Sequence, residues 1–254
     1  MRKPTDLCLL CNTNLASQTN SHIFPRFMGV TMLTSSNNKR EGYTTTTDFI
    51  DKLKSGNKIK PEQDTPKEDF ILCPSCENNF EKLETHFANK HYKVIDKPSL
   101  LNNKTDEVLI NKMPVIVNKK MDYIIYKKLI YSMLYRASIT SLPQFTNIHL
   151  PENNKNSIRQ IILNEIEFID YPTYSIIPAR DTEYTKNCIY ANSELDNKAH
   201  LLCVNDYIFI IDFGSQSYLL KNIARFKNHK EQYAKFGLLS DKVWDDWRKT
   251  FLGV

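Results

Sequence analysis

Hydrophobic residues recur at helical spacing in three parts of this chain, and each part predicts a helix. Residues 121–138 are apolar nearly all round, which is typical of a buried helix. A second segment near residue 158 has apolar residues on one face, and a third covers about residues 74–91. The positions that define these two helices are Ile158, Ile161, Ile162, Ile166 and Ile169 for the second, and Phe80, Leu83 and Phe87 for the third.

Shorter apolar runs, most of them in the second half of the chain, predict β-strands. These runs cover residues 70–72, 115–117, 174–177, 188–190, 201–204 and 207–213. The last two are expected to pair as a hairpin around Asn205-Asp206. Ser240 is a favourable N-cap for a final helix that carries Trp244 and Trp247.

A polar stretch rich in Thr, Asn and Lys interrupts the first part of the chain at residues 31–68. We interpret it as an insertion loop with one short helix near residues 48–53, either facing a substrate or lying plainly on the surface. Pro98 and the following Asn-rich run mark a boundary. The sequence therefore predicts an α+β protein, with an N-terminal module at residues 1–95 and a C-terminal domain of helices and antiparallel sheet at residues 96–254.

The composition is that of an ordinary globular protein and excludes few functions. Of the 254 residues, 41% are hydrophobic and 25% are charged, so the chain is long enough to bury a substantial core. A net charge of +5 is compatible with nucleic-acid binding without requiring it. The six glycines form no Gly-rich phosphate loop. Because the sequence has no long apolar run, we expect a soluble, cytoplasmic protein.

Two Cys-x-x-Cys pairs are the strongest chemical signal, and they predict a zinc site. Cys8 and Cys11 form the first pair, and Cys73 and Cys76 form the second. In a reducing cytosol such pairs are typical of metal ligands rather than disulfides, and four thiolates close a tetrahedral zinc shell. A zinc ion held in this way is structural, because no coordination position is open to water. The alternative is two unrelated pairs of buried thiols.

The arrangement of these pairs around a histidine indicates a known kind of module. Ser21-His22-Ile23-Phe24-Pro25 lies between the two pairs, and the second pair opens a helix, which is the pattern of a treble clef. Residues 7–91 resemble the zinc-braced HNH (ββα-metal) endonucleases. The resemblance implies that His22 is the general base that activates a water for attack on a DNA phosphodiester. It also implies a divalent cation, Mg²⁺ or Mn²⁺, that stabilises the leaving oxygen.

The sequence departs from the HNH pattern at two positions. Ser21 stands where the family usually has an acidic residue or a histidine, and Glu77 follows Cys76 where histidine or asparagine is usual. Glu77 is a suitable hard ligand, and Glu84 lies two turns further along the helix. We therefore expect a catalytic site of His22, Glu77 and Glu84, although the same glutamates fit a solvated helix face and the histidine fits a packing role.

Other charged residues of this module have weaker functional interpretations. Glu81 shares the helix face with Glu77, while His86 and His91 are expected to be exposed rather than ligands. Arg26, Lys39 and Arg40 fit either phosphate contacts or ordinary surface cations. Cys188 and Cys203 are expected in the core.

A looser resemblance extends to a group of uncharacterised bacterial HNH-like proteins. It rests on Gln63-Asp64-Thr65-Pro66-Lys67, on the Cys-Glu helix, and on a later helix that ends in Arg136-Ala137-Ser138. The resemblance implies a role in anti-phage defence or in a mobile element, and it makes Ser21 and Glu77 features of the group.

The function predicted from the sequence is that of a metal-dependent HNH-like endonuclease that cleaves DNA. In it the basic 31–68 loop contacts the nucleic acid, and the C-terminal domain recognises a partner, a ligand or the substrate. The alternatives are a non-catalytic zinc module that binds nucleic acid or protein, and a subunit that is active only in a larger complex.

Overall fold

The structure is a computed structural model, and it describes the greater part of the chain. The described residues are 2–30, 34–36, 39–41, 64–92, 105–110, 113–178, 189–193, 198–204, 207–214, 227–228 and 234–239. The helices predicted near residues 48–53 and after Ser240 lie outside these residues, as do Cys188 and the turn at residues 205–206.

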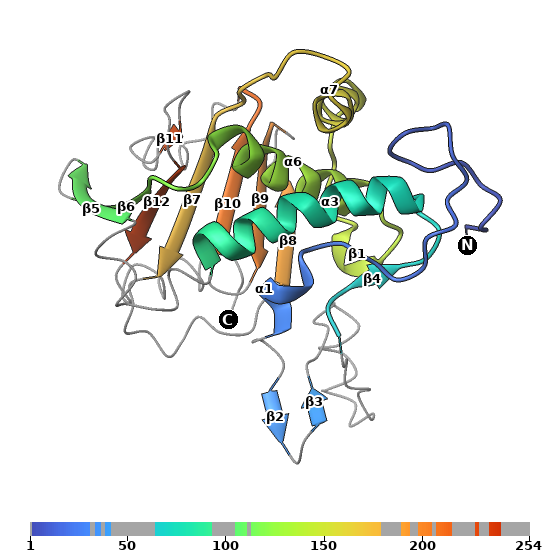
Figure 1. The fold of residues 1–254 in the computed structure, drawn as a ribbon, viewed down its shortest axis with the longest axis horizontal. Coiled ribbons are helices and arrows are strands. Elements are labelled where there is room, and N and C mark those ends of the chain that lie inside the picture. The colour runs from blue at the N-terminus through green and yellow to red at the C-terminus, as the bar shows by residue number, and fades with distance from the viewer. Residues whose placement is uncertain are drawn as a thin grey trace.

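The described residues form a mixed α+β protein with helices α1, α3, α6 and α7 (Figure 1). In chain order the elements are β1 (Ser21–His22), α1 (Arg26–Val30), β2 (Thr34–Ser36), β3 (Lys39–Glu41), β4 (Lys67–Glu68), α3 (Pro74–Phe87), a π-helical turn (Ala88–Tyr92), β5 (Thr105–Ile110), β6 (Met113–Asn118), α6 (Tyr123–Ile139), a 3-10 turn (Pro143–Phe145), α7 (Glu152–Leu163), β7 (Thr173–Pro178), β8 (Ile189–Ser193), β9 (Ala199–Val204), β10 (Tyr207–Asp212), β11 (Lys227–Asn228) and β12 (Ala234–Leu239).

The second half of the chain builds one large sheet. Its strand order is β5-β6-β12-β7-β10-β9-β8, with β11 pairing beside β7. Every pair is antiparallel except β12 with β7, which are parallel. The predicted hairpin of β9 and β10 is confirmed, with Tyr207 opposite Val204. Two small antiparallel pairs, β1 with β4 and β2 with β3, lie apart from this sheet.

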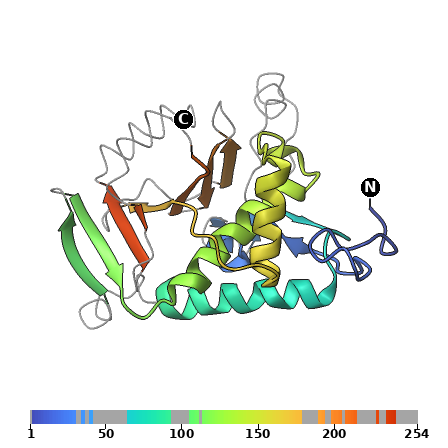
Figure 2. The same ribbon diagram turned by 90° about the horizontal axis from the view of Figure 1, so that it is seen from above.

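The long helices gather on one side of the large sheet (Figures 1 and 2). Helix α6 packs against both α3 and α7 and is buried along most of its length, as its nearly uniform apolar sequence predicts. It begins at Asp122, whose side chain accepts a hydrogen bond of 2.9 Å from the Ile125 amide. The predicted domains at residues 1–95 and 96–254 thus meet along the contact of α3 with α6.

Two predicted elements differ in extent. Helix α7 ends at Leu163, because Asn164 adopts a left-handed conformation with φ of 59° that closes the helix. Ile166 and Ile169 therefore follow the helix rather than extend it. The strand predicted at residues 70–72 is wrong: this segment is bent, Phe70 has φ of 60°, and the strand that pairs is β4.

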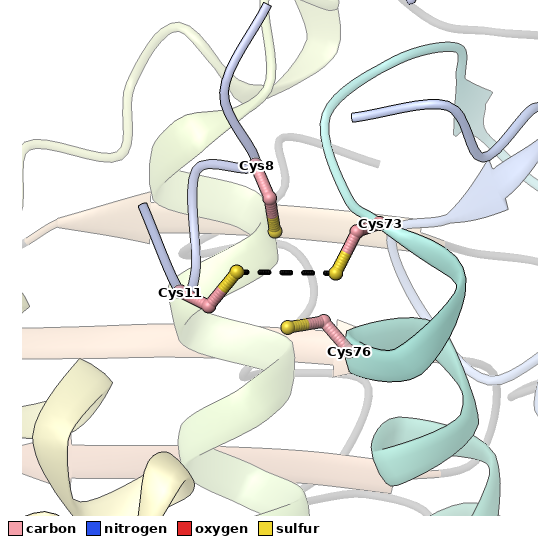
Figure 3. A group of neighbouring side chains, drawn as sticks. All are labelled: Cys8, Cys11, Cys73 and Cys76. Carbon is pink, nitrogen blue, oxygen red and sulfur yellow. Dashed lines mark hydrogen bonds between the residues drawn. The ribbon is translucent and has the colours of Figure 1, made fainter. Parts of the chain in front are cut away.

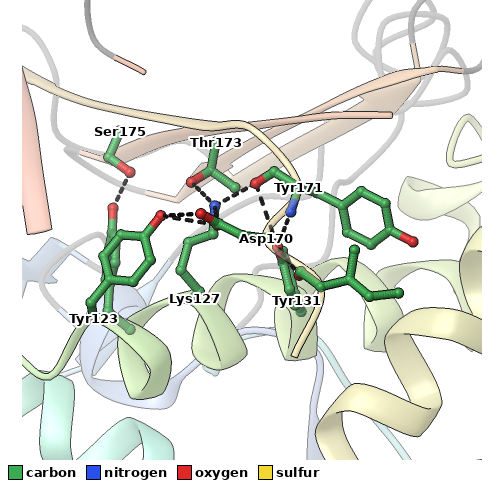
Figure 4. A network of polar contacts seen from close by, with 9 residues as sticks. Tyr123, Lys127, Tyr131, Asp170, Tyr171, Thr173 and Ser175 are labelled. Carbon is green, nitrogen blue, oxygen red and sulfur yellow. Dashed lines mark hydrogen bonds and ion pairs between the residues drawn. The ribbon is translucent and has the colours of Figure 1, made fainter. Parts of the chain in front are cut away.

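A buried polar network attaches α6 to the segment that enters β7 (Figure 4). The Lys127 ammonium group is fully buried and lies 2.9 Å from the Asp170 carboxylate. It also donates to the Thr173 hydroxyl at 2.8 Å and to the Tyr171 carbonyl. The Tyr123 hydroxyl donates to Asp170 at 2.9 Å. Each polar group has a partner within the core, so the network fixes the helix relative to the sheet.

No helix in the described part of the chain combines the length and the apolar character needed to span a lipid bilayer.

Candidate functional site

Four cysteine side chains converge between the N-terminal loop and the start of α3 (Figure 3). The sulfur atoms of Cys8, Cys11, Cys73 and Cys76 all lie within 4.8 Å of one another. A tetrahedral shell with Zn–S bonds of about 2.3 Å has sulfur atoms about 3.8 Å apart. The Cys11 and Cys73 sulfurs are 3.9 Å apart, which agrees with this value. The cluster is therefore compatible with a structural Zn²⁺ ion, as the sequence predicts.

Local backbone geometry explains how the first pair comes together. The Asn12 amide donates to the Cys8 carbonyl at 2.9 Å, and the Cys8 amide donates to the Asn14 carbonyl at 2.8 Å. Asn12 has φ of 57°, a left-handed conformation that asparagine tolerates. This turn aims both sulfurs of the pair at one point. The Leu9 amide donates to the Ile71 carbonyl at 3.0 Å and so attaches the turn to the segment before the second pair.

The pKa values of Cys8 and Cys76 depend on each other, and this coupling favours the binding of a cation. A hydrogen bond from the Cys76 thiol, together with backbone amides, lowers the pKa of Cys8 to about 4. The resulting thiolate raises the pKa of Cys76, because the two sulfurs share one proton and like charges repel. A divalent cation would replace these protons and stabilise all four thiolates, so metal binding would release protons.

A short antiparallel strand pair, β1 with β4, presents the predicted Ser-His motif beside the cysteines, and we call this pair the hairpin. Strand β1 pairs with β4 so that Ser21 lies opposite Glu68 and His22 lies opposite Lys67. Neighbouring residues of a strand point to opposite sides. Ser21 is accordingly fully buried, while His22 is half-buried.

The His22 imidazole is held by a residue from the end of the polar stretch. Its Nδ1 shares a hydrogen bond of 2.8 Å with the hydroxyl of Thr65, which is itself buried. Burial lowers the pKa of His22 below 6.5, and the nearby Lys67 and Arg26 act in the same direction, whereas Asp64 opposes them. The ring is therefore mostly neutral at pH 7, the state that a general base requires.

Ser21 and Glu77 lie close together on the other side of the strand. The Ser21 hydroxyl and the Glu77 Oε2 atom are both buried and have no hydrogen-bond partner among the described residues. Burial raises the pKa of Glu77, while the Arg136 charge and the Ser21 hydroxyl oppose the shift. The Glu77 carboxylate, with the Ser21 hydroxyl next to it, is a chemically suitable ligand for a hard cation.

Glu84 is engaged by a different partner. Its Oε1 atom lies 2.8 Å from the guanidinium of Arg136, which comes from α6 and is 1% exposed. Arg136 also donates to the His22 carbonyl oxygen at 2.7 Å. The structure thus places Glu77 in the first turn of α3 and Glu84 near the end of the same helix, where Glu84 pairs with the buried Arg136 guanidinium that also contacts the His22 carbonyl.

The remaining predicted residues have mixed outcomes. Glu81 is exposed, and the His86 Nε2 atom accepts a hydrogen bond of 3.3 Å from the Asp122 amide. The expectation that His91 is exposed is wrong. It is fully buried, because the π-helical turn after α3 brings its ring onto Phe236, with the ring centres 3.8 Å apart.

The predicted phosphate contacts are described only in part. Arg26 is mainly exposed, and its guanidinium lies 3.7 Å from Asp64. Lys39 and Arg40 belong to β3, which pairs with β2 so that Arg40 lies opposite Ser35. Most of the 31–68 loop that was expected to contact nucleic acid lies outside the described residues.

Sequence reasoning missed the residues that hold His22 in place. Thr65 and Arg136 both appear in the strings that carry the looser resemblance, but neither has a spacing that indicates its role. Glu68 is a third: its carboxylate accepts hydrogen bonds from the Ser141 amide at 2.9 Å and from the Thr140 hydroxyl. Residues 64–68 therefore belong to the site and not to an insertion.

Among the described residues, the four cysteines are the one group of at least three His, Cys, Asp or Glu residues whose ligand atoms converge. Comparison of the chain with protein-family models, with curated proteins and with solved structures found no match.

Proposed function

We propose that this protein is a metal-dependent HNH-like endonuclease that cleaves DNA, built on a zinc-braced treble clef. The observation that carries the proposal is the His22 imidazole, whose Nδ1 atom shares a hydrogen bond with Thr65 and whose pKa is lowered by burial. When Nδ1–H donates to the Thr65 hydroxyl, the lone pair of Nε2 is free to accept a proton from water.

The charges around His22 suit a phosphodiester substrate. Arg26 and Lys67 lie near the ring, and both act on its pKa as cations. Asp64 lies 3.3 Å from the Lys67 ammonium group and 3.7 Å from Arg26, so it orients both side chains. An incoming phosphate would gain charge-assisted contacts from these two residues while His22 activates the attacking water.

We propose that the cation such a reaction needs is held next to Glu77, on the Ser21 side of β1. The Glu77 Oε2 atom is buried beside the Ser21 hydroxyl, so we propose Glu77 as the ligand of Mg²⁺ or Mn²⁺. When bound, this ion would supply charge stabilisation for the leaving oxygen. Glu84 would act indirectly, through Arg136. A role in anti-phage defence or in a mobile element is part of the same proposal.

A plasmid-cleavage assay with Mg²⁺ or Mn²⁺ tests this function. We expect the wild-type protein to nick or linearise DNA and His22→Ala to lose the activity at unchanged zinc content. His149→Ala is the matched control, since this histidine is exposed and lies outside the site. Equal cleavage by wild type and His22→Ala would remove His22 from the chemistry.

The second candidate is a non-catalytic zinc module that binds nucleic acid or protein. It is favoured by the ion pair between Glu84 and Arg136, which takes Glu84 away from any metal cation and leaves Glu77 as the carboxylate beside Ser21. A binding module of nucleic acid predicts that the wild type and His22→Ala both bind DNA and do not cleave it. A subunit that is active only in a larger complex predicts neither DNA binding nor cleavage by the isolated protein.

A further inference from the structure

We infer that Arg136 is a positioning residue for His22, so that a side chain from α6 completes the site on the N-terminal module. The inference rests on the proposed function and deepens it. It also reassigns Glu84 from cation ligand to anchor of Arg136.

Arg136 makes one hydrogen bond and one ion pair, and these end on the two parts of the proposed site. One arm of its guanidinium donates to the His22 carbonyl oxygen at 2.7 Å, on β1. The other arm lies 2.8 Å from Glu84, on α3. The planar group therefore spans the strand that carries the base and the helix that carries Glu77, and it fixes the distance between them.

The surroundings of Arg136 leave it a single position. The side chain is 1% exposed, and its guanidinium carbon lies 4.8 Å from the ring centre of Phe80, also on α3. Its Nε atom points back to the Ser132 carbonyl at 3.4 Å. An arginine held by a stacked ring, a carboxylate and a carbonyl on its own helix transmits its position directly to the carbonyl of His22.

The two residues that follow α6 hold the second strand of the same hairpin. Glu68, opposite Ser21 in the strand pair, accepts hydrogen bonds from the Ser141 amide, at 2.9 Å, and from the Thr140 hydroxyl. Both strands of the hairpin are thus attached to the end of α6, one through Arg136 and one through Glu68. This helix lies outside residues 1–95, so the proposed active site depends on both parts of the chain.

Arg136→Lys tests the role. Lysine keeps the positive charge beside Glu84, but it lacks the planar guanidinium group that contacts Glu84 and the His22 carbonyl at the same time. We expect kcat for plasmid cleavage to fall at least about tenfold, with KM and zinc content unchanged. Arg159→Lys is the matched control. Arg159 also reaches the N-terminal module, donating to the Leu10 carbonyl at 3.1 Å and pairing with Glu165 at 3.3 Å, but it holds the cysteine turn instead of His22. Unchanged kcat in Arg136→Lys, or an equal fall in both variants, would overturn the inference.

Hydrogen exchange separates this inference from the proposed function. The Ile23 amide donates to the Pro66 carbonyl at 3.0 Å and so reports on the hairpin. We expect this amide to exchange at least about tenfold faster in Arg136→Lys than in the wild type or in Arg159→Lys. If the wild type cleaves no DNA, the proposed function fails, and the exchange result alone decides the positioning role. Unchanged exchange would overturn it.

Glu84→Gln takes the place of Arg136→Lys if the latter does not yield a folded zinc protein. It keeps the bond from Arg136 to His22 and weakens the other anchor. The inference predicts a smaller fall in kcat and the same Mg²⁺ concentration for half-maximal cleavage. A rise in the Mg²⁺ requirement would mean that Glu84 is a cation ligand and would overturn the reassignment.

Discussion

Two buried cations on helix α6 use the same physical device for different ends. Lys127 pairs with Asp170 and fixes the helix to the segment before β7, whereas Arg136 pairs with Glu84 and fixes it to the N-terminal module. With about 3.6 residues per turn, these two positions project from opposite faces of the helix. The Lys127 contacts with Asp170, Tyr171 and Thr173 are structural, whereas Arg136 also contacts the residue proposed as the base. Burial of an ion pair therefore does not by itself indicate a function. The further residue that the buried cation contacts, here His22 for Arg136, is what distinguishes the two pairs.

Metal removal should give the largest effect. It should unfold the N-terminal module on one side of α6 and leave the sheet on the other side folded. A structural zinc ion in a small module contributes about 10–16 kcal/mol of apparent folding free energy at pH 7. A chelator or Cys76→Ala should therefore expose the amides of residues 2–30 and 64–92 to exchange, while those of α6 and β7 stay protected. Cys203→Ala, a core cysteine outside the cluster, is the control and should retain zinc. Full protection of residues 2–30 after metal loss would contradict the account.

Lys127→Met should give the next largest effect and should act on stability alone. Asp170 would be left largely buried without its cation, which costs about 3–5 kcal/mol. Lys128→Met is the neighbouring control; its ammonium group is partly exposed and pairs with the Asn164 side chain, so its loss should cost less than about 1 kcal/mol. Denaturant unfolding measures both. A fall in kcat of folded Lys127→Met, comparable to that of Arg136→Lys, would erase the distinction between the two cations.

Gly29→Ala should disturb His22 through Thr65. A Cβ atom at this position would lie 2.0 Å from the Thr65 Cγ2 atom, so Thr65 must move. We expect weaker cleavage and a loss of about 1–3 kcal/mol in stability, as in other overpacked cores. Thr65→Ser removes that methyl group but keeps the hydroxyl for His22, so the double variant should recover activity. Full activity of Gly29→Ala, or no recovery in the double variant, would argue against Thr65 as the support of His22.

The sequence revealed the cysteine cluster but not the support of the histidine, for a physical reason. Metal ligands need fixed residue types at short spacings, so Cys8, Cys11, Cys73 and Cys76 are visible as a pattern. Likewise, the uniform apolar character of α6 and the pairing of β9 with β10 follow from local periodicity. Thr65 and Arg136 act through single hydrogen bonds between distant segments, which leave no periodic trace.

The errors have the same origin. Phe70 takes a left-handed conformation that an apolar run does not encode, and the strand falls on Lys67 and Glu68 instead. His91 is buried because a π-helical turn follows α3, a change of register that continued α-helical spacing cannot predict.

His91 gives an effect on stability that is small near pH 7 and grows only in acid, on the sheet side of the molecule. Complete burial lowers its pKa to about 3, from 6.5 in the unfolded chain. Between these values the unfolded state binds more protons, so stability should fall as the pH drops from 6.5 towards 3, by up to about 1.4 kcal/mol per pH unit. His91→Phe should remove this contribution, since phenylalanine stacks on Phe236 without taking up a proton. The same acid slope in His91→Phe and wild type would show that other groups cause it.

The most direct test of the central claim, that the hairpin presents a neutral histidine as the base, is the pH profile of kcat for plasmid cleavage with saturating Mg²⁺. Burial and the neighbouring cations lower the pKa of His22 below 6.5, so the base is lost only when the pH falls through that lowered value. The account predicts a rate that rises from acid pH and is constant by pH 7, and it predicts that Thr65→Val shifts or lowers this limb. A wild-type rate that does not change with pH below 6.5, or an identical limb in His22→Ala, would contradict it.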